Sequence, residues 1–258
     1  FAAGMIPGLI LAALFVLVIW VMVRLFPERA PAGERMAWGD RIRAILAMWK
    51  LVLLFGIAVG GIYAGWFSPT EAAGIASFVA IVIATASRQL TWRGLYDCVM
   101  ETLRTTGMLM FIIVGAWIFA YFVVQTRLPT GLIDLIKYFD LAPWAVIMMI
   151  LVFYIILGCV LDAVAIILVT VPVFLPVATA LGYDSVWYGI LMVVVVEIGL
   201  ITPPVGLNIF VMRAQLPDIL LTTMFRGIAP FLVADGILIA LLLLFPQIAL
   251  WLPRLLYG

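Results

Sequence analysis

The chain has 258 residues, of which 67% are hydrophobic and 10% are charged, with a formal net charge of +1 at pH 7 and a mean hydropathy of +1.32. A composition this apolar excludes a soluble domain, and the near-neutral charge gives no indication of a nucleic-acid partner. Histidine is absent, which excludes imidazole metal sites and histidine proton relays. At about 20 apolar residues per crossing, most of the chain is expected to lie in a lipid bilayer.

The first predicted element is a spanning helix over residues 6–25. Residues 26–49 then form the longest polar stretch, which the positive-inside rule places in the cytoplasm. Residues 36–49 are amphipathic enough to lie along the membrane interface. The basic residues in and next to this stretch are Arg29, Arg35, Arg41, Arg43 and Lys50.

Two further spans are predicted over residues 50–66 and 71–87, which leave the cytoplasm and return to it. Between them, Ser68-Pro-Thr-Glu71 has the pattern of a capping box, with proline at the first helical position. This motif predicts a helix start, and a structural role is sufficient to explain it.

The middle of the chain combines interfacial and spanning patterns. Residues 91–104 carry charged residues among apolar ones and predict an interfacial arm rather than a span. Residues 108–124 predict a clear span, and a short amphipathic piece follows around residues 131–139.

Two short apolar helices, residues 144–157 and 163–180, flank the segment from Gly158 to Asp162. They predict a re-entrant hairpin, although one long kinked helix is the alternative. An acidic side chain at membrane depth is a functional hypothesis by default. Asp162 also suits the N-cap of the second helix, and capping and attraction of a cation are compatible roles.

The apolar stretch over residues 186–212 is interrupted by the sequence Gly199-Leu-Ile-Thr-Pro-Pro-Val-Gly-Leu-Asn208. Two prolines between two glycines cannot continue a regular helix. Within lipid, the freed backbone groups require protein or a wet cavity, and a span broken at this depth indicates an ion or substrate site. Carbonyl oxygens and the Thr202 hydroxyl suit a hard cation such as Na⁺; the alternative is a simple proline kink.

The last elements are an interfacial arm over residues 217–226 and a final span over residues 229–252. Gly4-Met-Ile-Pro7 and Gly227-Ile-Ala-Pro230 both open long apolar helices, which flanking arginines orient in opposite directions. Such a pair is the signature of inverted repeats. We therefore divide the chain into the last helix of a first repeat (1–27), a cytoplasmic loop with scaffold helices and an arm (28–104), a transport domain with hairpin and broken helix (105–215), and an arm with the terminal helix (216–258).

Three motifs occur together in a characteristic order: Gly65-Trp-Phe-Ser-Pro-Thr-Glu-Ala-Ala73, Gly158-x-x-x-Asp162 followed by Pro172 and Pro176, and the sequence from Gly199 to Asn208. The chain thereby resembles the C-terminal portion of the large membrane subunit of tripartite ATP-independent periplasmic (TRAP) transporters. The resemblance implies an all-α integral membrane protein with inverted repeats and an elevator mechanism. It also implies Na⁺ coupling, a small membrane subunit, a periplasmic binding protein that delivers an organic acid, and location in a bacterial or archaeal inner membrane.

The resemblance further implies one Na⁺ site between the hairpin tip and the broken helix, held mostly by backbone carbonyls. Carried onto this chain, its ligands are Gly158, Gly199, Thr202 and Val205, with Val205 contributing its backbone. A first hairpin and the other half of the substrate cavity are expected upstream of Phe1. The residues near the substrate or ion are Asp162, Pro203, Pro204, Gly206 and Asn208.

Two other functions compete with transport. One is a non-transporting membrane scaffold. The other is an intramembrane aspartyl protease, which needs two facing carboxyl groups that share a proton, here two of Asp162, Glu197 and Asp235. The Tyr-Asp pair at residues 183–184 falls in a predicted loop and disfavours the protease. Glu197 is expected either to pair with Arg213 or to face water.

Overall fold

A computed structural model of the chain describes residues 2–26 and 37–257. All regular elements in these residues are α-helices, and contacts between them divide the chain into two compact units. Unit 1 comprises Phe1–Ala30 and Leu109–Gly258, and unit 2 comprises Pro31–Met108. The predicted basic loop around Arg29 and Arg35 lies outside the described residues.

Unit 2 is built around two packed apolar helices. The helix α4 begins at a capping box, in which the Ser68 hydroxyl accepts the Glu71 N–H and the Glu71 carboxylate accepts the Ser68 N–H at 2.8 Å. At the opposite end, Lys50 Nζ donates to Ser87 Oγ at 2.6 Å, which places the start of α3 beside the end of α4. The elements of unit 2 are α2 (Trp38–Ala47), α3 (Trp49–Tyr63), α4 (Pro69–Ala86) and the first part of α5 (Trp92–Gln125).

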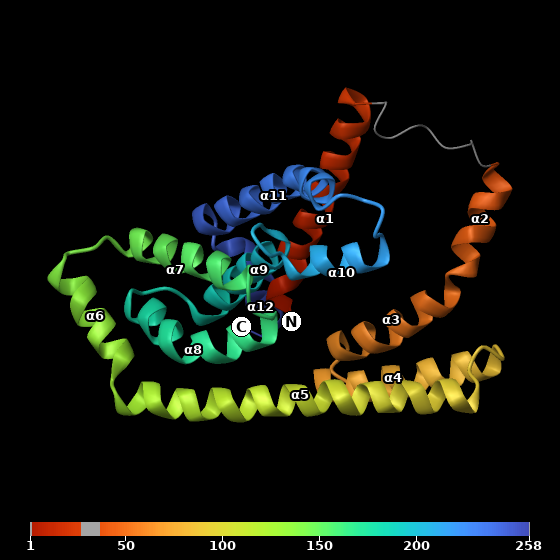
Figure 1. Cartoon of the computed structure of the whole chain (residues 1–258), viewed down its shortest axis with the longest axis horizontal. Helices are drawn as coiled ribbons and strands as arrows, with labels where there is room; N and C mark the ends of the chain where they lie inside the picture. The colour runs from red at the N-terminus through yellow and green to blue at the C-terminus, as the bar shows by residue number, and fades with distance from the viewer. Residues whose placement is uncertain (1, 27–36, 258) are drawn as a thin grey trace. The chain divides into compact units, whose positions relative to one another are not determined.

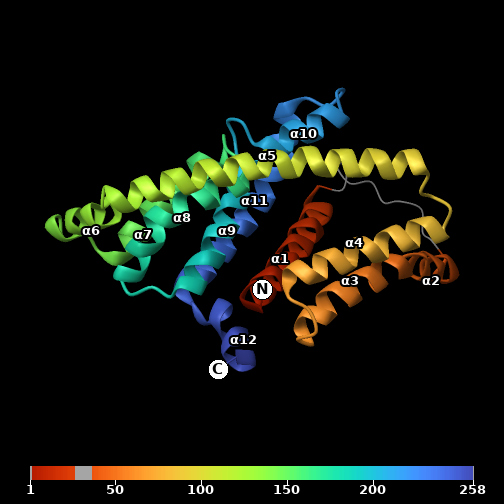
Figure 2. The same cartoon turned by 90° about the horizontal axis from the view of Figure 1, so that it is seen from below.

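Unit 1 is organised around one central helix, α9 (Ser185–Ile201), which packs against most of the other helices of the unit. Figure 1 shows α9 enclosed by α7, α8 and α11, and Figure 2 shows the same group turned by 90°. The buried Trp187 donates its indole N–H to the Leu242 carbonyl at 2.8 Å, which ties α9 to α11. The other elements are α1 (Ala2–Leu25), α6 (Leu128–Tyr138), α7 (Pro143–Gly158), α8 (Ala163–Ala180), α10 (Leu207–Gln215), α11 (Leu221–Leu244) and α12 (Gln247–Tyr257).

The all-helical membrane class predicted from composition is confirmed. Five described helices are long and apolar enough to cross a bilayer, or six if α2 and α3, which meet at a bend of 46°, form one span. The helices of the predicted hairpin, α7 and α8, are separate elements that lie side by side, joined by four residues. Ring contacts of Phe174 on α8 with Phe153 and Tyr154 on α7 hold the two together.

Two predicted segments have different limits in the structure. The arm over residues 91–104 and the span over residues 108–124 are one continuous helix of 34 residues, α5, because no glycine–proline break separates them. The predicted last span over residues 229–252 is wrong at both ends, since α11 already begins at Leu221 and ends at Leu244. Pro246 follows, and its missing N–H and fixed φ end the helix there.

The two helices that suggested an inverted repeat contact each other and run in opposite directions. Phe15 of α1 packs edge-to-face on Phe231 of α11, with ring centroids 5.3 Å apart. Gly8, earlier in α1, lies by Leu238, later in α11, in one small cavity. The opposite direction agrees with the inverted orientation predicted from the flanking arginines; the repeat relationship itself stays a prediction.

Candidate functional site

The tip between α7 and α8 is a tight reversal of the chain that begins at Gly158 and ends at Asp162. Leu161 N–H donates to the Leu157 carbonyl at 2.8 Å, which closes the end of α7. Asp162 takes an extended conformation, and its carboxylate accepts the Val164 N–H at 3.0 Å as the N-cap of α8. The capping role predicted for Asp162 is therefore confirmed, and its side chain is exposed.

The predicted break is present between α9, which ends at Ile201, and α10, which begins at Leu207. Thr202 leaves the helix in an extended conformation, and the Pro203–Pro204 peptide bond is cis. Gly206 starts α10 with φ of 61°, a left-handed conformation that glycine adopts without steric cost. The sequence Thr-Pro-Pro-Val-Gly thus separates two half-helices, as its composition predicts.

The hairpin tip packs directly on the helix that contains the break, backbone against backbone. A Cβ atom placed on Gly158 would lie 2.7 Å from the Gly199 Cα, and a Cβ on Gly199 would lie 2.6 Å from the Gly158 Cα. Only two glycines permit this approach. Next to them, the Cys159 thiol donates to the Pro203 carbonyl at 3.4 Å, a second contact between tip and break.

Four helix ends lie at or next to this junction. The C-terminal ends of α7 and α9 carry the negative end of the helix dipole, and the N-terminal ends of α8 and α10 carry the positive end. In a continuous helix the Leu200 carbonyl would accept the N–H of residue 204, but proline at that position has none. The Thr202 hydroxyl donates to the Ile198 carbonyl at 2.6 Å, so its oxygen lone pairs stay available for a cation.

The predicted site residues fall into two groups. Gly158, Gly199, Thr202 and Pro203 lie at the junction, and Val205 and Gly206 follow it in the same short segment, half-buried and buried respectively. The side chains of Asp162, Pro204 and Asn208 are exposed, as is that of Pro203, whose carbonyl makes the contact with the tip. Within the described residues, the Asp162 carboxylate accepts one hydrogen bond, from the Val164 N–H in the first turn of α8.

Comparison with known proteins assigns the chain to a family. Residues 1–248 match the family model described as "Tripartite ATP-independent periplasmic transporter, DctM component". The chain belongs to this family. The family predicted from the three motifs is therefore confirmed.

Several relatives of this DctM-family chain are named TRAP transporter large permease proteins. They include the C4-dicarboxylate permease of Pseudomonas aeruginosa (35% identical, covering 98% of this chain and 59% of the relative), the sialic acid permease of Vibrio cholerae (32%, 100% and 60%) and the ectoine permease of Halomonas elongata (33%, 99% and 59%). The chain thus spans about 60% of the length of the relatives it matches. Because these relatives are permeases, not enzymes, the protease alternative is not supported.

Of the two alternatives predicted for Glu197, the pairing with Arg213 is not seen within residues 2–26 and 37–257. Arg213 donates to the Ile219 carbonyl at 2.6 Å and does not pair with Glu197, which is exposed beside a cavity of about 150 Å³. Asp235 is 4% exposed on α11, and no hydrogen bond of its carboxylate is seen within residues 2–26 and 37–257.

Two features of this chain were not predicted from the sequence. Cys159 is a buried free cysteine directly after Gly158, and the sequence alone does not predict its contact with Pro203. The buried hydroxyls of Tyr154 and Tyr188, 3.1 Å apart, link α7 to α9 below the junction. A tyrosine inside an apolar helix needs a hydrogen-bond partner for its hydroxyl, so the two tyrosines could have been predicted to pair.

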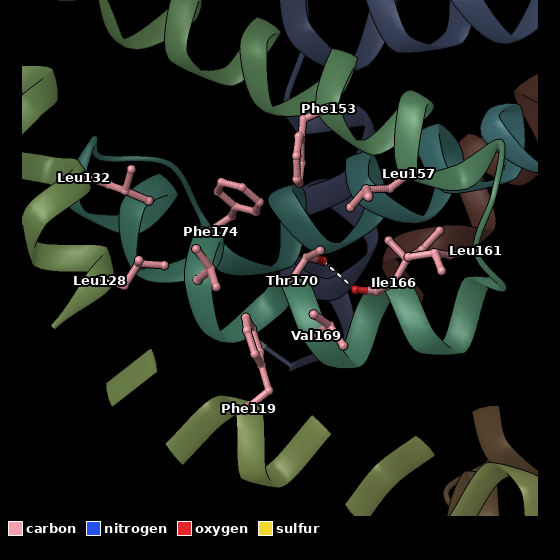
Figure 3. Close-up of a pocket in the computed structure, with 11 residues that line it drawn as sticks. Phe119, Leu128, Leu132, Phe153, Leu157, Leu161, Ile166, Val169, Thr170 and Phe174 are labelled. Atoms are coloured by element: carbon pink, nitrogen blue, oxygen red, sulfur yellow. Dashed lines mark hydrogen bonds between the residues drawn. The ribbon is translucent and has the colours of Figure 1, made fainter. Parts of the chain in front are cut away.

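A separate cavity of about 380 Å³ lies on the other side of the hairpin and is lined entirely by apolar surface apart from Thr170. Figure 3 shows Phe119, Phe153 and Phe174 around it, with the Thr170 hydroxyl turned back to donate to the Ile166 carbonyl at 2.6 Å. Because the Thr170 hydroxyl is the only polar side-chain group in the lining and its proton is donated to Ile166, this cavity offers no donor to an anion and lacks the several oxygen ligands that a cation needs. The candidate ion site is therefore the tip–break junction.

Proposed function

We propose that this chain forms the hairpin-and-broken-helix half of the large permease of a Na⁺-coupled secondary transporter that imports a small organic acid. The observation that carries the proposal is the contact between Gly158 and Gly199, which brings the hairpin tip onto the interrupted helix. Two helix C-terminal ends and a proline-freed carbonyl then face one small region, a chemistry suited to a hard monovalent cation.

The proposed Na⁺ ligands are the carbonyl groups of Gly158, Gly199 and Val205 together with Thr202. Backbone ligands agree with the lack of any group of three or more His, Cys, Asp or Glu side chains able to hold a metal within the described residues. A site of neutral carbonyls binds Na⁺ without the desolvation cost of bringing carboxylates into the membrane. It also leaves the nearby Asp162 carboxylate free for its capping role.

The coupling follows from where the cation sits. A cation bound between α7, α8 and the α9–α10 break favours the arrangement in which tip and half-helices stay packed. In the proposed elevator mechanism, this cluster moves across the membrane as a body relative to scaffold helices, and the tip acts as a re-entrant gate. Binding energy of the ion thereby favours the loaded state that carries the organic acid.

The partners proposed are a small membrane subunit and a periplasmic binding protein that delivers the substrate, in the inner membrane of a bacterium. The names of the relatives include a C4-dicarboxylate, sialic acid and ectoine, so this half of the permease accompanies several cargoes. The junction itself presents no arginine that would select one carboxylate. The chemical class of the cargo is therefore a small organic acid, without further selection by these residues.

Uptake of radiolabelled organic acid by the assembled transporter in proteoliposomes, with its binding protein added, tests the proposal. Transport should require an inward Na⁺ gradient and stop when K⁺ replaces Na⁺ on both sides. The control is liposomes that contain the transporter without the binding protein. Uptake that continues unchanged in K⁺ would contradict Na⁺ coupling, and a chain that never supports uptake would favour the scaffold alternative.

A further inference from the structure

Helix α2 of unit 2 presents an apolar stripe that none of the described residues of the unit covers. Trp38, Ile42, Ile45 and Leu46 are 76%, 54%, 69% and 64% exposed, and no residue of α2 is buried. Their spacing of three and four residues places them on one face of the helix. At ten residues α2 is about 15 Å long, too short to cross a bilayer by itself.

Two arginines border this stripe. At 3.6 residues per turn, Arg41 and Arg43 fall on opposite sides of the face that carries Trp38 and Ile45. The Arg41 guanidinium lies over the Trp38 ring, 5.1 Å from its centroid. Arg43 approaches Asp40 at 3.9 Å with its side chain 87% exposed. An ion pair this exposed contributes little, so the Arg43 guanidinium stays available to another anion.

More basic groups lie at the same end of unit 2. The hydrogen bond from Lys50 to Ser87 brings together the start of α3, directly after α2, and the end of α4. Arg88 follows Ser87 at once, and Arg93 lies in the first turn of α5. We call this set the basic belt; its members are Arg41, Arg43, Lys50, Arg88 and Arg93.

We propose that α2 lies in the headgroup region of a leaflet that contains anionic phospholipids, with the apolar stripe among the acyl chains and the basic belt on the lipid phosphates. Charge complementarity favours this occupant. An exposed apolar stripe bordered by arginines is the pattern of an interfacial helix, and long basic side chains reach from such a position to phosphates. Each basic group near an anionic surface adds attraction that salt screens. This inference does not rest on Na⁺ coupling.

The test compares two neighbouring positions of α2 in the assembled transporter. Ile45→Cys lies on the apolar stripe and Ala44→Cys on the opposite face, each in a Cys98→Ser background because Cys98 is exposed. Each cysteine carries a nitroxide, and its accessibility to oxygen and to a water-soluble nickel chelate is measured in vesicles of phosphatidylcholine with phosphatidylglycerol. The label at 45 should be relaxed mainly by oxygen and the label at 44 mainly by the chelate.

The lipid dependence completes the experiment. Replacing phosphatidylglycerol by phosphatidylcholine should move the label at 45 toward the water phase, and Arg41→Gln with Arg43→Gln should abolish most of that lipid-dependent shift. Equal access of the chelate to both labels would place α2 in water and overturn the proposal. Shielding of both labels from both reagents would indicate a protein partner and overturn it equally, as would the same depth in both lipids.

Discussion

Two interruptions of apolar helices in this chain treat their backbone groups in opposite ways. In the turn between α3 and α4, the capping box of Ser68 and Glu71 satisfies the start of α4, and the Trp66 and Phe67 N–H groups both bond the Gly61 carbonyl. At the break between α9 and α10, prolines remove donors and Gly206 starts α10 without a side-chain cap. The first turn is closed by hydrogen bonds within its own chain, whereas the second is where we propose that carbonyl oxygens bind a cation.

The two regions also differ in what packs against their glycines. A Cβ on Gly61 would meet the ring of Phe67, a side chain that can rotate away, whereas a Cβ on Gly199 would meet backbone. Substitutions at the closed turn should therefore change stability, and those at the open break should change ion dependence. Each prediction below tests that separation.

The largest effect is expected for Gly199→Ala, because the added methyl lies 2.6 Å from the Gly158 Cα and must push the tip off α9. Overpacking of this kind costs about 1–3 kcal/mol. Na⁺-dependent uptake should fall to background, and the thermal unfolding midpoint in detergent should decrease.

The matched control is Gly189→Ala in the same helix, where no heavy atom lies within 4 Å of the added Cβ. Alanine favours a helix over glycine by up to about 1 kcal/mol, so this variant should transport and unfold at the same or a higher temperature. Full uptake by Gly199→Ala would refute the idea that backbone contact forms the site.

The second effect concerns the hydroxyl at the break. Thr202→Ala removes an oxygen ligand while leaving the backbone in place, and should raise the half-saturating Na⁺ concentration roughly tenfold, since hydrogen bonds and contacts to a charge contribute about 1.5–3 kcal/mol. Thr202→Ser should restore most of the affinity. The measurement is the uptake rate as a function of Na⁺ concentration.

Thr179→Ala serves as its control, because the Thr179 hydroxyl also donates four residues back, to the Leu175 carbonyl at 3.0 Å, but lies exposed away from the junction. It should leave the Na⁺ dependence unchanged. If Thr202→Ala and Thr179→Ala behave alike, the Thr202 side chain is not a ligand.

The sequence predicted the open turn well because proline and glycine act locally. The break at Thr202–Gly206, the cap at Asp162 and the closed turn at Ser68 all follow from covalent properties of a few neighbouring residues. That Gly158 would meet Gly199 was implied by the family resemblance alone, since nothing local links positions 41 residues apart.

Long-range packing accounts for what was missed. The Cys159–Pro203 contact and the Tyr154–Tyr188 pair depend on how α7 lies on α9, which periodicity does not fix in helices that are apolar on all sides. The boundaries predicted for the segments that form α5 and α11 were wrong for a related reason. Charged residues suggested separate arms, but α5 propagates through them without an internal proline, and α11 continues even through Pro230.

A moderate effect confined to stability is expected at the closed turn. Ser68→Ala removes the capping hydroxyl and should lower the free energy of unfolding by about 1 kcal/mol without changing the half-saturating Na⁺ concentration. Ser77→Ala is the control, since its hydroxyl donates to the Ala73 carbonyl within the same helix α4 and alanine is favoured there. A changed Na⁺ dependence in Ser68→Ala would break the separation between the two turns.

The smallest effect is expected for Asp162→Asn, because Asp162 is a helix cap that also lies next to the proposed ion site. Asparagine caps helices about as well as aspartate, and the Asp162 side chain is exposed with one backbone partner, so the unfolding midpoint should hardly change. Asp162→Ala, which loses the cap, should unfold at a lower temperature and separates capping from charge. If Asp162→Asn transports normally at low Na⁺, the residue only starts α8. If uptake then needs more Na⁺ while stability is unchanged, the carboxylate attracts the cation electrostatically from the rim of a site whose direct ligands are backbone oxygens and the Thr202 hydroxyl.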